Sequence, residues 1–205
     1  MVDWKGFIPP QYIVRASRFK RVVLDPPSFE PGSWIGAGRI FYDHIFREYL
    51  MTVRPRKPAP ARGVEVKIYS SKNGEDFYLK TALTKEDISR DMKTEVLSIE
   101  GVQIIRDPLT DLLYLYVSVD YKQAWETILY VSDDPAGPWE YRGFVLKTDE
   151  PHDAKEARDV AVDIIDGAYF MFYKAQREVK NVKSRSSYKS RRYSLEKTRH
   201  THCRR

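Results

Sequence analysis

Residues 98–118 decide the fold, and they read SIEGVQIIRDPLTDLLYLYVS. The apolar run at 102–105 leads into the polar stretch 106–111, which contains Asp, Pro and Thr, and an aromatic-rich run follows at 112–118. Short apolar and aromatic runs separated by turn residues are typical of β-strands joined by a turn. The stretch therefore predicts an antiparallel hairpin.

Two other segments follow the same plan. Residues 39–53 and 160–173 each hold an apolar run, a turn that contains Asp and an aromatic-rich run, and the three hairpins start near positions 38, 101 and 159. A second hairpin, with alternating polarity and a turn, follows the first two at 64–77 and 127–139. A repeat of about 60 residues that carries four strands indicates a propeller blade. A meandering β-sandwich is the alternative.

We therefore expect an all-β fold, with residues 34–174 in consecutive antiparallel four-stranded units and almost no helix. The best helix signal is Thr84 to Met92, where Thr84 and Asp87 have the spacing of a capping box, although a turn would also fit. Two full units and the opening hairpin of a third fit in this range. About two and a half blades are therefore expected, fewer than the roughly four that a closed ring needs.

Charge divides the chain into a body and a tail. The 205 residues carry 35 Lys or Arg and 29 Asp or Glu, but residues 177–205 hold eleven of the basic residues and only two of the acidic ones. The remainder has 24 basic and 27 acidic residues, so the tail supplies all of the net charge of +6. Such a tail lacks apolar periodicity and predicts disorder or an out-of-frame end. We expect an N-terminal extension at 1–33, a partial propeller at 34–176 and this basic tail at 177–205.

The pattern stops inside a blade, which has consequences for completeness. We expect that the intact fold needs about 100 more residues to close its ring, and that this chain alone is marginal or inactive. The last predicted strand, near Tyr173, would leave an open blade edge, which is a place for self-association.

Cysteine and hydropathy patterns bear on the compartment. The single cysteine, Cys203, allows no disulfide within the chain and no cysteine-based metal site. The start of the sequence has no apolar segment of the signal-peptide kind, and the apolar runs are too short to span a bilayer. We expect a cytoplasmic protein with no membrane partner.

Three motifs carry a resemblance to a known family. Residues 98–118 resemble the Glu-Gly-Pro-x-hydrophobic…Tyr-Tyr-Leu-x-Tyr-Ser motif of five-bladed β-propeller glycoside hydrolases of the arabinanase/xylosidase type. Residues 158–175 resemble their Asp-Pro-x-hydrophobic…Asp-Gly-x-Tyr-Tyr-Met-Phe-Tyr motif, and residues 71–77 resemble their Ser-x-Asp-Gly-x-x-Trp/Phe turn. Together the motifs cover about two-thirds of the chain, roughly 34–174.

The resemblance implies a glycosidase with carboxylates in a central pocket and no cofactor or metal. It gives Glu100 the general-acid position and Asp159 that of a second catalytic carboxylate, at what we take to be equivalent places of adjacent repeats. The first unit has Gly36, Ala37 and Gly38 at that place and no acid, a departure from the family pattern. Carboxylates in such a pocket are expected to have a raised pKa through burial and like-charge repulsion.

Further residues are candidates for binding a carbohydrate substrate. Arg54 and Arg56 follow the aromatic strand of the first unit, in a predicted loop, and a guanidinium there suits a sugar hydroxyl, a carboxylate or a phosphate. Trp34 lies near the predicted pocket, and His152 precedes Asp159. The remaining turn aspartates and the other tryptophans are expected in hairpin turns and in the blade core; these are Asp43, Asp107, Asp111, Asp166, Trp125 and Trp139.

Two functions of other classes remain open. The missing acid and the missing blades favour a non-catalytic, carbohydrate-binding propeller fragment. Nucleic-acid binding through the tail, which interleaves Lys and Arg with Tyr188 and Tyr193, is less favoured because the tail has no recognised module signature.

Overall fold

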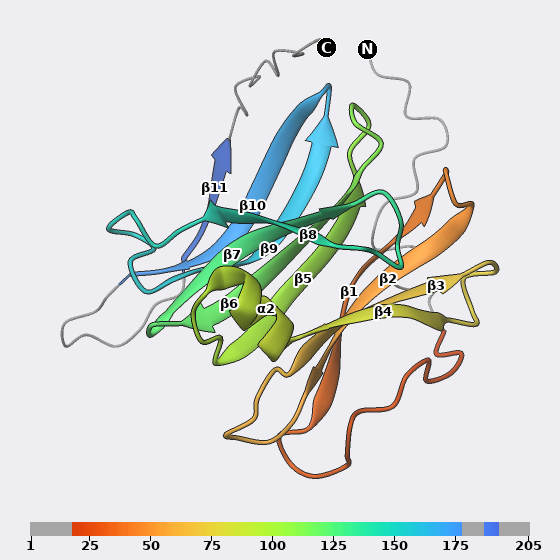
Figure 1. Cartoon of the computed structure of the whole chain (residues 1–205), viewed down its shortest axis with the longest axis horizontal. Coiled ribbons are helices and arrows are strands. Elements are labelled where there is room, and N and C mark those ends of the chain that lie inside the picture. Colours follow the sequence, from red (N-terminus) through yellow and green to blue (C-terminus); the bar gives the residue numbers. More distant parts are fainter. Residues whose placement is uncertain (1–17, 178–186, 193–205) are drawn as a thin grey trace.

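The computed structural model describes residues 18–177 and 187–192, and the described part is built almost entirely of β-strands (Figure 1). The first four strands form a four-stranded sheet in chain order, with every neighbouring pair antiparallel. They are β1 (Trp34–Asp43), β2 (Glu48–Arg56), β3 (Glu65–Ser71) and β4 (Tyr78–Thr84). This unit matches the predicted pair of hairpins.

The next strands repeat the arrangement and begin a third unit. The second unit is the antiparallel meander β5 (Ser98–Arg106), β6 (Leu113–Tyr121), β7 (Ala124–Ser132) and β8 (Glu140–Leu146). The third consists of β9 (Glu156–Ile165), β10 (Ala168–Gln176) and β11 (Ser187–Arg192). A parallel bridge between Trp125 and Glu156 joins these two units along one edge. The prediction of four-stranded antiparallel units is confirmed for two units.

Helix is scarce, as expected. The described residues contain one helix, α2 (Lys85–Met92), and Thr84 and Asp87 form the predicted capping box at its start. Ile88 is fully buried and fastens the helix to the core. No helix within residues 18–177 and 187–192 is long and apolar enough to cross a membrane.

The units stack face to face, with the second unit between the other two. Successive side chains of a strand point to opposite faces, so β6 sends Leu115 and Val117 into one core and Tyr116 into another. The first core joins the second unit to the first through Leu50 and Ile68. The second core joins it to β9 and β10, through residues that include Leu146, Val162 and Met171.

The first strands of the three units lie in a row, and close contacts between them fix their spacing. A Cβ on Gly38 would come within 2.5 Å of the carbonyl oxygen of Val102, so only glycine lets β1 approach β5 so closely. Gln103 binds β9 through both ends of its amide: Nε2 donates to Val162 O at 2.8 Å, and Oε1 accepts from Val162 N at 2.7 Å. β1, β5 and β9 therefore form one continuous inner wall.

The basic tail differs from the prediction at one place. Ser187–Arg192 forms β11, which pairs antiparallel with β10 from Ala175 to Phe170 (Figure 1). The physical reason is that backbone N–H and C=O groups on the edge of β10 can bond a neighbouring chain whatever its side chains. The predicted open edge at β10 is thus covered along these residues. Tail residues 178–186 and 193–205, Tyr193 among them, lie outside the described part of the chain.

Candidate functional site

Each inner strand carries a β-bulge at the same height. The register with the neighbouring strand shifts between Ala37 and Ile40 in β1 and between Glu100 and Val102 in β5; in β9 it shifts just after Arg158. A bulge adds one residue to a strand and re-aims the side chains around it, and bulges are common next to functional sites. The three bulges therefore define one level at which side chains can converge.

The bulges correct the equivalence assumed for Glu100 and Asp159. Glu100 and Arg158 each form the last regular pair before the bulge, whereas Gly101 and Asp159 occupy the bulge itself with φ of 38° and 55°. The two carboxylates are therefore one position out of register, because Arg158 is the counterpart of Glu100. Residues other than glycine seldom have a positive φ, so the backbone of Asp159 is strained, and such strain is often found at functional sites.

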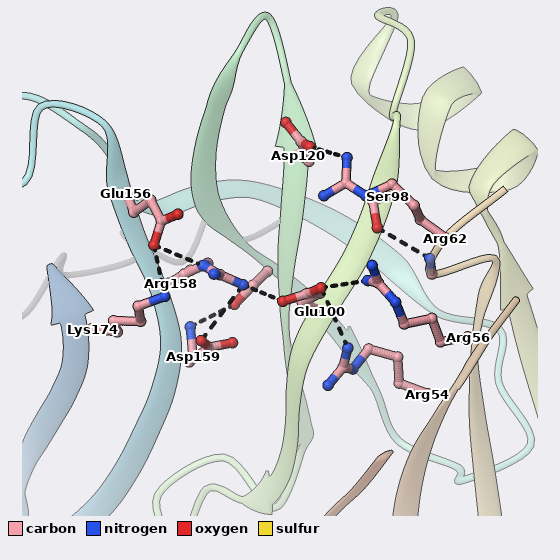
Figure 2. A network of polar contacts seen from close by, with 12 residues as sticks. Arg54, Arg56, Arg62, Ser98, Glu100, Asp120, Glu156, Arg158, Asp159 and Lys174 are labelled. Carbon is pink, nitrogen blue, oxygen red and sulfur yellow. Dashed lines mark hydrogen bonds and ion pairs between the residues drawn. The ribbon is translucent and has the colours of Figure 1, made fainter. Parts of the chain in front are cut away.

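Glu100 lies at the centre of a cluster of arginines from two neighbouring units (Figure 2). Arg56 Nη1 donates to Glu100 Oε1 at 2.7 Å, and Arg54 Nη1 lies 3.8 Å from the same oxygen. From the other side, Arg158 Nη1 donates to Glu100 Oε2. Both carboxylate oxygens thus accept from guanidinium groups.

The two arginines of the first unit lie on a strand, not in the predicted loop. β2 continues through Arg56, and Pro55 is tolerated there because β3 pairs with β2 only as far as Val53. Residues two apart on a strand point to the same face. This is why Arg54 and Arg56 both reach Glu100.

Asp159 lies beside this cluster and faces open space. Its Oδ2 is 3.7 Å from Arg158 Nη1, the same nitrogen that binds Glu100, and its backbone N–H donates to Ser118 Oγ at 2.9 Å. Burial raises the pKa of Asp159; Arg158 opposes this shift and the nearby Glu100 carboxylate adds to it. Both carboxylates contact this one nitrogen of Arg158, so they lie side by side.

A trough of about 530 Å³ opens along the bulges of the three inner strands. Its lining includes Gly36 and Gly38 of β1, Gly101 of β5, Arg54 and Asp159. The first unit contributes no carboxylate, as expected. A Cβ on Gly36 would come within 3.0 Å of Arg54 Nη2, so the guanidinium of Arg54 occupies the space beside this glycine.

Tryptophan rings flank the arginines on both sides. Arg54 lies 4.6 Å and Arg56 5.7 Å from the ring centre of Trp34, which is 41% exposed. The buried ring of Trp125 carries Arg158 at 4.4 Å and Arg62 at 5.4 Å. Stacking of this kind holds a guanidinium plane in a fixed orientation.

Sequence reasoning missed several members of the network. Arg158 is not among the predicted site residues, although its place in the repeat, equivalent to that of Glu100, is a usable signal. Glu156 accepts from Arg158 Nε at 3.1 Å and pairs with Lys174 at 2.9 Å, so it holds Arg158 from behind. Arg62 pairs with Asp120 at 2.6 Å at the edge of the same network (Figure 2).

His152 is the predicted site residue that the structure leaves apart. It precedes β9, where its Nε2 lies 3.0 Å from Tyr173 Oη and 3.5 Å from Asp153 Oδ2, and it does not line the trough. Among residues 18–177, no group of three or more His, Cys, Asp or Glu side chains is placed to hold a metal ion.

The fold is similar to that of known carbohydrate-active enzymes, although no protein-family model and no curated protein matches the sequence. One similar structure is a GH43 β-xylosidase/α-arabinofuranosidase from a compost microbial metagenome, solved in complex with xylotriose in a calcium-free form. The TM-score is 0.52 at 16% identity, over 75% of this chain and 46% of the xylosidase. Another is a protein assigned as an exo-β-1,3-galactanase from Bifidobacterium bifidum, with a TM-score of 0.46 at 14% identity, over 66% of this chain and 43% of the other.

At 16% identity, the similarity to the xylosidase concerns the fold alone. Both similar structures are propeller glycoside hydrolases, and this chain spans less than half the length of each. Within that span the described part of the chain is all-β, and its strands are arranged as in a glycoside-hydrolase-like fold.

Proposed function

We propose that this chain is part of a five-bladed, glycoside-hydrolase-like propeller whose trough binds a carbohydrate, and that Glu100 and Asp159 act on a glycosidic bond. The observation that carries the proposal is the convergence of both carboxylates on Arg158 Nη1 at the bulged rim of the trough. Glycosidic bond cleavage needs two carboxyl groups that lie close to each other, on either side of the bond that breaks. The chain spans 46% of the xylosidase, so the activity is proposed for the whole protein.

The geometry favours Asp159 as the proton donor. It lines the trough, and its raised pKa keeps more of the acid form available near neutral pH than an exposed carboxyl would. Asp159 gives its proton to the leaving glycosidic oxygen as the C–O bond breaks. Water then adds its hydroxyl to the anomeric carbon and returns a proton to Asp159, so the net reaction is hydrolysis.

Glu100 is better suited to an electrostatic role than to the general-acid position that the family resemblance implies. Its oxygens already accept from Arg56 and Arg158. Glu100 therefore orients the two guanidinium groups beside Asp159.

Non-catalytic carbohydrate binding is the second candidate. The observation that favours it is the replacement of a first-unit carboxylate by glycines and by the guanidinium of Arg54. Such a trough can hold a sugar by hydrogen bonds and by the exposed Trp34 ring without cleaving it.

Turnover and binding together test these candidates. The whole protein is assayed on aryl arabinosides, xylosides and mannosides, and oligosaccharide binding is measured by calorimetry. Asp159→Asn is expected to lower kcat by about 10²-fold or more while binding is kept. The control is Asp163→Asn, an exposed carboxylate on the same strand that does not line the trough.

The possible outcomes separate the candidates. Unchanged turnover in Asp159→Asn removes the proton-donor role. Binding without turnover in the unmodified whole protein selects the non-catalytic candidate. Neither binding nor turnover contradicts both.

A further inference from the structure

The arginine cluster beside the trough carries more positive than negative charge. Three guanidinium groups, those of Arg54, Arg56 and Arg158, surround two carboxylates, Glu100 and Asp159. Glu156 offsets part of the charge of Arg158, but it also pairs with Lys174. The excess grows when Asp159 takes up a proton, which its raised pKa favours. Positive charge that lines a cleft attracts anions.

Arg54 is the member of this cluster with bonding capacity to spare. Its Nη1 is buried yet donates no hydrogen bond within the described structure, and Glu100 Oε1 is 3.8 Å away. A buried donor left unsatisfied destabilises the folded state. Burial and the neighbouring arginines also lower the pKa of Arg54, with burial the larger cause and Glu100 and Asp159 opposing it. The positive charge of the Arg54 guanidinium is thus only partly balanced by neighbouring carboxylates.

Arg54 is also held in a fixed position. Its guanidinium stacks on Trp34 at 4.6 Å, fits against Gly36 and lines the trough. A planar guanidinium in a fixed orientation presents parallel N–H groups that match the two oxygens of a carboxylate or a phosphate. A neutral sugar hydroxyl would use only part of that geometry.

We propose that Arg54 forms a subsite for an anionic group, a carboxylate or a phosphate, on the carbohydrate that occupies the trough. This inference rests on the proposed function for its sugar but not for its anion. The substrate class is then an acidic sugar, either a uronic acid or a sugar phosphate. The Arg56 and Arg158 guanidinium groups reinforce the site by their charge while staying bound to Glu100.

Calorimetric titration tests the subsite with four probes: inorganic phosphate, glucuronate, glucose and a neutral xylo-oligosaccharide. We expect phosphate or glucuronate to bind at least tenfold more tightly than glucose. Preference for glucuronate identifies a carboxylate, and preference for phosphate identifies a phosphate group. Equal affinity for glucuronate and glucose, with no phosphate binding, overturns the subsite.

Two variants connect the binding to Arg54. Arg54→Gln is expected to lose at least tenfold in anion affinity, whereas Arg142→Gln, which removes an exposed arginine paired with Glu140 on β8, should lose none. Gly36→Ala keeps every charge but adds a methyl group 3.0 Å from Arg54 Nη2, so it should displace the guanidinium and weaken anion binding as well. Anion affinity unchanged in both Arg54→Gln and Gly36→Ala overturns the proposal.

The same titrations keep this inference apart from the proposed function. Binding of the neutral oligosaccharide without anion preference leaves carbohydrate binding intact and overturns only the subsite. Phosphate binding that Arg54→Gln abolishes, with no oligosaccharide bound, supports the subsite and contradicts carbohydrate binding.

Discussion

Two arginine–carboxylate clusters join neighbouring units of the inner wall, a buried one at the hairpin end of β1 and β5 and a partly exposed one at the bulges. At the hairpin end, Asp43 Oδ2 accepts from Arg106 Nε at 2.8 Å and from Nη2 at 2.5 Å. Asp43 Oδ1 accepts from the backbone N–H groups of Ile45 and Phe46. The remaining nitrogen of Arg106, Nη1, donates to Asp111 O. The side chains of Asp43 and Arg106 are 0% and 4% exposed.

At the bulges the pairing between arginines and carboxylates is incomplete. Glu100 faces three guanidinium groups, Arg54 Nη1 makes no hydrogen bond in the described structure, and Asp159 has a raised pKa. A closed, fully bonded pair stabilises a fold, whereas uncompensated charge beside an open trough suits a ligand. The degree of pairing, rather than residue type, therefore separates the structural cluster from the candidate site.

Removing Arg106 should have the largest effect. Arg106→Met leaves the fully buried Asp43 without its cation, and an uncompensated buried charge costs about 3–5 kcal/mol of unfolding free energy. Chemical denaturation measures the loss. Arg142→Met, at an exposed position, should change the free energy by less than about 0.5 kcal/mol. A loss below about 1 kcal/mol for Arg106→Met would mean that the Asp43–Arg106 pair does not stabilise the fold.

Removing the charge of Glu100 should have the next largest effect. Glu100→Gln leaves three guanidinium groups facing one another without their shared partner, and we expect a loss of about 2–3 kcal/mol, less than at Arg106 because this cluster is partly exposed. Glu140→Gln is the matched exposed control. Equal stabilities of the two variants in denaturant would show that Glu100 does not hold the arginines together.

Arg54→Met sharpens the contrast with Arg106→Met because the substitution is the same. Arg54 is only 13% exposed, but its removal relieves repulsion from Arg56 and Arg158 and eliminates an unsatisfied donor. The unfolding free energy should stay within about 1 kcal/mol of the unmodified chain or rise. A loss as large as that of Arg106→Met would make the bulge cluster structural too.

Asp159→Asn should stabilise the fold slightly. Burial raises the pKa of Asp159, so the folded state disfavours its ionised form, and Asn tolerates the positive φ at this position. The side chain is 38% exposed, and solvent screening keeps the expected gain near 0.5 kcal/mol at pH 7.

The pH dependence fixes the sign of that effect. A carboxyl whose folded pKa is raised binds its proton more tightly in the folded state, so the unmodified chain loses stability as pH rises from the ordinary value of 3.8 through the raised one. The advantage of Asp159→Asn should appear over that window and vanish below it. An advantage that is constant with pH would contradict the raised pKa.

The sequence predicted the units well because hairpins depend on local chemistry. The Asp-containing turns recur at 43, 107 and 166, and the structure has Asp43 and Asp107 accepting from backbone N–H groups of their turns. Repetition then brought Glu100 and Asp159 close together, because β5 and β9 are the first strands of stacked units and share an inner wall; Arg54 reaches Glu100 from β2. Trp125 and Trp139 pack at or beside the blade core as expected.

The sequence could not predict the features that depend on pairing between strands. A bulge is visible only in the register with the neighbouring strand, so Asp159 was matched to Glu100 when Arg158 is its counterpart. The extension of β2 through Pro55 depends on where β3 stops pairing. The sequence predicts a free edge at β10, but the composition of the tail does not reveal that residues 187–192 pair with it as β11.

The most direct test of the account is to map ligand binding by NMR on the ¹⁵N-labelled chain. The backbone amides of Gly36, Gly38 and Gly101 line the trough, whereas those of Asp43 and Arg106 report on the hairpin-end cluster. On titration with glucuronate or an acidic oligosaccharide, the account predicts saturable shifts at the three glycines and none at the hairpin end. Shifts confined to the hairpin end, or no shifts at the glycines under saturating ligand, would contradict it.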